Sequence, residues 1–293
     1  MAKISAFRAR LEECAADPRA TVIALHCSGA GGAMWQPLRN ALGSDVRLLS
    51  PDLYGAADGP DWPGDSAFSL DAEAAPIIGM IDNSPQPVHL VGHSYGGAVA
   101  LYAALKRPSR IASLALYEPA NFHLLKSADG IEYGEILWLA RDVDALLLRG
   151  DHRGAMKRFV NYWNGAGAWD LMSPDAQRAL MQWAPKAALD FRALLEGPGA
   201  SSRFDWLDVP CHIVSGERSP DPVREIARIV CDQMPNSTMS VLPGAGHMGP
   251  ITHGAEVAAR MAGHIRRHQP VDPMSTIQEE NSSPRFLEAS IAK

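Results

Sequence analysis

The run PVHLVGHSYGGAVALYAALKRP, residues 87–108, constrains the fold of this chain more than any other segment. Apolar residues before its central turn predict a buried strand, and those after the turn recur at helical spacing. Gly92 and Gly96 flank Ser94 and leave room for a strained residue between the strand and the helix. A G-x-S-x-G pattern in this strand–turn–helix context predicts that Ser94 is a nucleophile.

Strands and helices alternate along most of the chain, which predicts an α/β fold with a mostly parallel sheet and helices on both faces. The six predicted strands are residues 21–27, 46–50, 88–93, 113–119, 209–216 and 237–243. The predicted helices are residues 4–16, 34–42, 69–82, 223–233 and 255–268. A further helix is predicted to follow the turn at Ser94 and to end near residue 106. Parallel sheets carry their chemistry at the carboxyl ends of the strands, and the candidate catalytic residues below follow strands.

Between residues 121 and 204 the strand pattern stops and helical patterns replace it. Ser173-Pro174 is typical of a helix start, with proline at the first helical position. We expect an all-helical cap here, inserted into a core of residues 1–120 and 205–268. Most of its aromatic residues should hold the cap to the core: Tyr133, Trp138, Phe159, Tyr162, Trp163, Trp169 and Trp183. The polar residues 269–293 are predicted to be a disordered tail.

Bulk composition limits the partners of the chain. Its 293 residues are 46% hydrophobic and 20% charged, which is enough apolar material for a large core, and the net charge is −6. No basic run interleaved with aromatic residues favours nucleic acid, and no stretch is long and apolar enough to span a bilayer. The N-terminus lacks the apolar core of a signal peptide, so we expect a cytoplasmic protein acting on a small molecule.

Cysteine and histidine spacing predicts neither a disulfide framework nor a metal site. Cys14, Cys27, Cys211 and Cys231 are scattered without a C-x-x-C pair, and a reducing compartment keeps such thiols free. Histidines occur singly, and no H-E-x-x-H motif is present. We therefore expect no metal and no cofactor, and the sequence leaves the oligomeric state open.

A serine hydroxyl is a weak nucleophile and needs a base within hydrogen-bond reach, which a carboxylate must orient. His247 is the candidate base, because it follows the last predicted strand in the glycine-rich loop VLPGAGHMGP. His93 is a weaker candidate. It neighbours Ser94 in sequence, so its side chain should point away from the serine hydroxyl and serve packing or support.

The oxyanion of the transition state needs preorganised donors, usually backbone N–H groups. We expect one donor from Tyr95, the residue after the nucleophile. The second should come from the turn after the first predicted strand, with Ser28 favoured and Gly29 as the neighbouring alternative. The competing interpretation is that SGAGG is only a flexible turn. A dinucleotide site is not indicated there, because no complete G-x-G-x-x-G occurs.

With these motifs the chain resembles the α/β-hydrolase superfamily. The resemblance rests on LHCSGAGG, PDLYG, LVGHSYGG, LYEP and GAGHM, which span most of residues 21–268. It implies the fold, a serine–histidine–acid triad and a helical cap after the fourth predicted strand. The chain departs from the family in two places besides the acid. Cys27 stands where the family usually has glycine, and no antiparallel hairpin is evident at the N-terminus.

The orienting acid is the third departure. The family commonly carries it in a G-x-x-D pattern after the fifth predicted strand, and here that segment reads GERS, with Ser219 in the acid's place. Glu118 ends the preceding strand, where some family branches, including haloalkane dehalogenases, carry their acid. Asp221 could substitute if the loop were rebuilt. We favour Glu118, because a strand end is rigid and a buried carboxylate is costly unless it is paired.

These residues together predict a serine hydrolase that acts on a small or medium, largely apolar carboxylic ester through an acyl-enzyme. Trp138, Trp163 and Met248 are the candidate pocket residues. A C–C bond hydrolase or a cofactor-free haloperoxidase would use the same serine site. A ligand-binding receptor with little or no turnover is the alternative from another class, because aspartate is missing at position 219.

Overall fold

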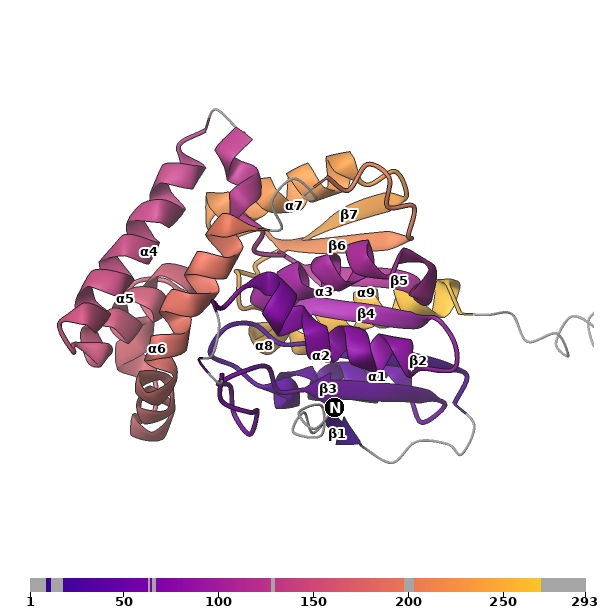
Figure 1. Ribbon diagram of the computed structural model, residues 1–293, viewed down its shortest axis with the longest axis horizontal. Helices are drawn as coiled ribbons and strands as arrows, with labels where there is room; N and C mark the ends of the chain where they lie inside the picture. The colour runs from indigo at the N-terminus through magenta and orange to yellow at the C-terminus, as the bar shows by residue number, and fades with distance from the viewer. Residues whose placement is uncertain are drawn as a thin grey trace, which may run out of the picture.

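The computed structural model describes residues 9–11, 18–62, 64, 67–127, 130–197 and 203–269. Seven strands of these ranges form one sheet in the order β1-β3-β2-β4-β5-β6-β7 (Figure 1). β1 pairs antiparallel with β3, and all other neighbours pair in parallel. The strands are β1 Ala9–Leu11, β2 Ala20–Leu25, β3 Val46–Pro51, β4 Val88–His93, β5 Ile111–Tyr117, β6 Cys211–Gly216 and β7 Ser237–Leu242. The predicted mostly parallel sheet is confirmed.

Helices cover both faces of the sheet because successive side chains of a buried strand point to opposite sides. In β2, Val22 and Ala24 join a core with residues of α1 and α9, whereas Ile23 and Leu25 join a core with residues of α2 and α3. The helices around the sheet are α1 Gln36–Leu42, α2 Leu70–Asp82, α3 Tyr95–Lys106, α7 Asp221–Gln233, α8 Gly249–Thr252 and α9 Gly254–Arg267. Short 3-10 turns are η2 Gly32–Trp35, η3 Pro108–Arg110, η4 Phe122–Ser127 and η5 Ala168–Leu171.

The segment between β5 and β6, which we call the cap, is helical where the structure describes it, and its helices lie together at one side of the sheet (Figure 1). Its helices are α4 Glu132–Leu148, α5 His152–Asn164 and α6 Pro174–Glu196. The Ser173 side chain caps α6 by accepting from the Ala176 N–H at 3.2 Å, as its sequence signal predicts. The Trp163 ring of α5 lies 4.6 Å from the ring of His247, so this aromatic residue of the cap contacts the core.

The N-terminal prediction is wrong where the structure describes it. Residues 9–11 form β1 and not part of a helix, and Arg10 lies opposite Ser50 in the antiparallel pair with β3. Strand pairing satisfies the backbone groups along the free edge of β3, and this gain depends on the sheet and not on local periodicity. The predicted tail, beyond Gln269, and Cys14 lie outside the described residues.

The cysteines and the helices of the described residues also bear on disulfides and on membrane spans. Cys27, Cys211 and Cys231 are free thiols, as their scattered spacing predicts. No helix within the described ranges combines the length and the apolar character needed to cross a bilayer.

Candidate active site

Ser94 occupies a sharp turn between β4 and α3. Its backbone has φ 53° and ψ −115°, a region that side chains rarely adopt, and its N–H donates to the Tyr117 carbonyl at 3.0 Å. Glycines on both sides make the turn possible. A Cβ atom on Gly96 would lie 2.3 Å from the Leu25 carbonyl oxygen, and one on Gly92 would lie 2.6 Å from the backbone of α3. The elbow therefore holds Ser94 close to the carboxyl end of β2.

Ser94, His247 and Glu118 form a continuous hydrogen-bonded chain. His247 Nε2 lies 3.0 Å from Ser94 Oγ, and His247 Nδ1 lies 2.7 Å from Glu118 Oε2. All three side chains are buried. Because a carboxylate only accepts, Nδ1 carries the imidazole proton and Nε2 is left to accept from the serine hydroxyl. This geometry permits a proton to pass from Ser94 to His247.

Glu118 is held rigidly. It has no exposed surface, and its backbone φ of 43° aims the side chain off the end of β5. Its Oε1 accepts from Ser215 Oγ at 2.8 Å and from the Gly216 N–H at 2.7 Å, so both carboxylate oxygens are used. Asp221 does not join this chain and instead pairs with Arg224 at 3.2 Å on the exposed start of α7. Ser219 is buried, and its hydroxyl has no hydrogen-bond partner among the described residues.

The loop that carries His247 is tied to the sheet by side chains below it. His93 Nε2 lies 2.8 Å from the His247 carbonyl oxygen and donates to it, and the Tyr117 hydroxyl donates to the Gly246 carbonyl at 2.7 Å. Burial holds the pKa of His93 well below its ordinary value, so its ring is neutral. His93 thus contacts the loop of His247 and not the serine hydroxyl. Its position next to Ser94 in the sequence indicated such a supporting role.

Two backbone segments meet beside Ser94. Tyr95 is the first residue of α3, so its N–H has no partner within the helix. Ser28 and Gly29 follow β2 and line the same cavity as Ser94. Cys27 also lines it, but burial raises the pKa of its thiol to about 12, so it is not a thiolate near neutral pH.

A cavity of about 370 Å³ opens above Ser94 and His247. None of the described residues that line it is Lys, Arg, Asp or Glu. Trp163 and Met248 line the cavity, and the Trp163 ring lies 4.6 Å from that of His247. Trp138 does not. It is 54% exposed on α4 and lies beneath the Arg158 guanidinium, so its predicted place in the pocket is corrected.

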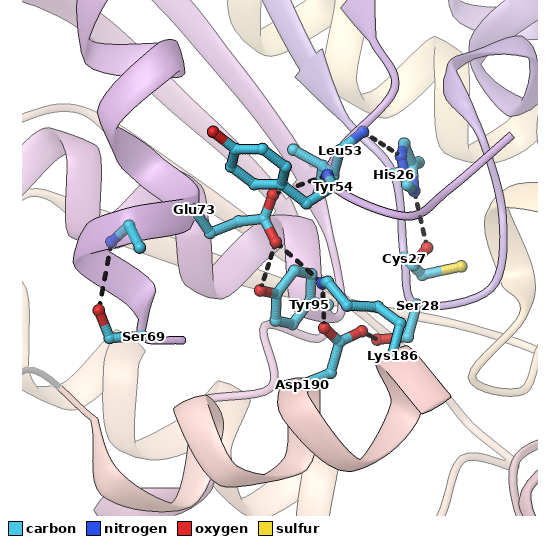
Figure 2. A network of polar contacts seen from close by, with 11 residues as sticks. His26, Cys27, Ser28, Leu53, Tyr54, Ser69, Glu73, Tyr95, Lys186 and Asp190 are labelled. Atoms are coloured by element: carbon cyan, nitrogen blue, oxygen red, sulfur yellow. Dashed lines mark hydrogen bonds and ion pairs between the residues drawn. The ribbon is translucent and has the colours of Figure 1, made fainter. Parts of the chain in front are cut away.

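A buried ion cluster that was not predicted from the sequence borders this site and consists of Glu73, Lys186 and Asp190 (Figure 2). A signal for part of it was present. Lys186 and Asp190 are four residues apart on α6 and lie in the same turns as Ala187 and Phe191, which are buried. Charged residues on an apolar stripe seldom stay unpaired, so they indicated an interior partner.

No group of three or more His, Cys, Asp or Glu residues within the described ranges is arranged to hold a metal ion.

Comparison with known proteins agrees with the fold. The model of the alpha/beta hydrolase family matches residues 22–260. The lipase LipV of Mycobacterium tuberculosis is 31% identical over 156 residues, and this chain spans about half of its length (53%). A pimeloyl-(acyl-carrier protein) methyl ester esterase of Neisseria meningitidis is 28% identical over 81% of this chain and 90% of its own.

Among solved structures, MenH from S. aureus superposes with a TM-score of 0.71 at 19% identity. The match covers 89% of this chain and 98% of that one, which shows a shared fold. The family model covers most of the chain and all of the strands from β3 to β7. The protein therefore belongs to the alpha/beta hydrolase family, as its sequence motifs predict.

Proposed function

We propose that this hydrolase cleaves a neutral, largely apolar carboxylic ester through an acyl-enzyme, with Ser94, His247 and Glu118 as its catalytic triad. The observation that carries the proposal is the hydrogen-bonded chain of these three residues beneath an apolar cavity. Its geometry is that of a serine activated by a base which a buried carboxylate orients.

The proposed cycle uses only groups of this chain and water. His247 Nε2 takes the hydroxyl proton as Ser94 Oγ attacks the ester carbonyl carbon, and the backbone N–H groups of Tyr95 and Ser28 bind the oxyanion. His247 then protonates the alkoxide oxygen as the C–O bond breaks, and the alcohol leaves. Water, activated by His247, attacks the acyl-enzyme and releases the acid. Glu118 stabilises the imidazolium that forms in each half of the cycle.

The cavity supports an uncharged substrate. Its lining includes Phe159, Trp163, Leu180 and Ile251, and no charged residue within the described ranges would pair with a substrate carboxylate or phosphate. The named activities of two relatives, a lipase and a methyl ester esterase, both involve ester bonds to acyl groups. Together they favour an acyl ester of modest size over a C–C bond or a peroxide reaction.

The test is burst release of p-nitrophenol from short-chain p-nitrophenyl esters, together with covalent labelling by a fluorophosphonate. We expect a burst close to one equivalent and a label on Ser94, and we expect Ser94→Ala to lose both. A folded wild-type protein that shows neither burst nor label contradicts the proposal and favours a ligand-binding receptor.

A further inference from the structure

Three charged side chains lie in the interior between the cap and the core. Glu73 is 0% exposed, Asp190 3% and Lys186 7%. Lys186 Nζ lies 2.9 Å from Glu73 Oε2 and also bonds to Asp190 Oδ1 (Figure 2). A buried ion group of this kind rarely adds stability over a well-packed apolar one, so its presence calls for another explanation.

The two ends of this cluster reach Ser28 and Tyr95, the two residues whose backbone N–H groups are the proposed oxyanion donors. At one end, the Ser28 hydroxyl donates to Asp190 Oδ2 at 2.6 Å. At the other, the Tyr95 hydroxyl donates to Glu73 Oε2 at 2.8 Å. Lys186 joins the two carboxylates, and it belongs to cap helix α6 whereas Glu73 belongs to core helix α2. One connected set of bonds therefore runs from Ser28 to Tyr95 through the cap.

We propose that Glu73, Lys186 and Asp190 are positioning residues that set the place of the oxyanion donors Ser28 and Tyr95, so that the site is complete only while α6 is seated. This inference rests on the proposed function, because it assigns a role to the donors of that reaction. None of the three charged residues touches the reacting atoms. Each acts through the residue to which it is bonded.

The turn after β2 is anchored by side chains, whereas the start of α3 is held by the backbone of a helix. Gly29 has a φ of +73°, and the Gly32 N–H donates to the Asp52 side chain (Oδ1) at 2.6 Å and not to backbone. Within this turn, the Ala30 N–H donates to the Cys27 carbonyl at 3.2 Å. Tyr95, by contrast, is held by the backbone of a helix. The bond from the Ser28 hydroxyl to Asp190 therefore anchors a donor that no helix backbone holds.

The protonation states of the cluster favour the hydrogen bonds that join Ser28 to Tyr95. Burial raises the pKa of Asp190 to about 6, and the Lys186 ammonium limits that rise. Burial alone would lower the pKa of Lys186, but the two carboxylates raise it above its ordinary value, so the ammonium persists. Tyr95 has its pKa raised well above the usual value by burial and then by Glu73, so it stays a hydrogen-bond donor.

The experiment compares Ser28→Ala, Asp190→Ala and the double variant with wild type. Ser28→Ala keeps the backbone N–H and removes only its anchor. A displaced oxyanion donor weakens the transition state and not the ground state, so we expect each single variant to lose about 10- to 100-fold in kcat with little change in KM. The rate of fluorophosphonate labelling should fall in parallel. The double variant should lose no more than the worse single variant, because Ser28→Ala and Asp190→Ala both remove the Ser28–Asp190 bond.

A matched control is Glu135→Gln, which changes a cap carboxylate that accepts from the Tyr162 hydroxyl at 2.7 Å and has no contact with Ser28. It should keep the wild-type kcat. Unchanged kcat in a folded Ser28→Ala variant overturns the inference, and so do losses that multiply in the double variant. Ser28→Ala alone decides the question if Asp190→Ala does not fold. A wild-type enzyme that takes no label refutes the proposed function itself, which is a different outcome.

Discussion

The change Glu118→Gln should abolish most activity by reversing the tautomer of His247. Glu118 Oε1 accepts two bonds, from Ser215 Oγ at 2.8 Å and the Gly216 N–H at 2.7 Å. A glutamine must keep its carbonyl oxygen there, because an amide nitrogen does not accept. Its NH₂ group then faces His247 Nδ1, so Nδ1 must accept and the ring proton moves to Nε2.

That proton would point at Ser94 Oγ, 3.0 Å away, and His247 would no longer act as a base. A wrong tautomer of the triad histidine lowers kcat by about 10⁴-fold. This corresponds to about 5.4 kcal/mol of activation free energy. The shape of the side chain is unchanged, so the fold should survive, and a thermal melt checks this point.

The assay is steady-state hydrolysis of a short-chain p-nitrophenyl ester over a range of pH. The matched control is Asp221→Asn, which removes an exposed carboxylate paired with Arg224 and should keep kcat within about 2-fold. A folded Glu118→Gln enzyme with more than about a tenth of the wild-type kcat would refute the tautomer argument. A larger loss in Asp221→Asn would move the orienting role to that residue.

Three further predictions concern stability and the cavity. Gly96→Ala should lose about 3 kcal/mol of unfolding free energy in a urea titration, because the new Cβ would lie 2.3 Å from the Leu25 carbonyl oxygen, and a fully stable variant would contradict this. Asp190 keeps its proton up to a pKa of about 6 when folded but releases it near 3.9 when unfolded, so unfolding free energy falls as pH rises through that window. Relative to Asp190→Asn, wild type should therefore lose about 1.4 kcal/mol between pH 5 and 7, and equal slopes would argue against the shift. Trp163→Ala should widen the cavity and raise the kcat/KM ratio of octanoyl to acetyl esters about 10-fold, and an unchanged ratio would remove Trp163 from the acyl pocket.

Local sequence patterns were sufficient to predict most strands and helices of the α/β core. The elbow at Ser94 is predictable because its strand, its glycines and its helix are adjacent in sequence and each needs a particular residue type. The cap helix α6 is predictable from Ser173-Pro174 and its apolar period for the same reason. β1 was missed, because a three-residue edge strand forms only against an existing neighbour, here β3.

The sequence by itself determined the alternation of strands and helices and the nucleophile elbow. It also limited the acid that orients His247 to two candidates, Glu118 and Asp221. Only the tertiary structure decided that Glu118 meets His247, which is 129 residues away, while Asp221 stays in solvent. It also decided that Ser28 and Asp190, 162 residues apart, share a hydrogen bond. The periodicity of apolar residues predicts which face of a helix or strand is buried, but it does not predict which buried side chains contact one another. That is set by how the sheet, the cap and the loops pack together.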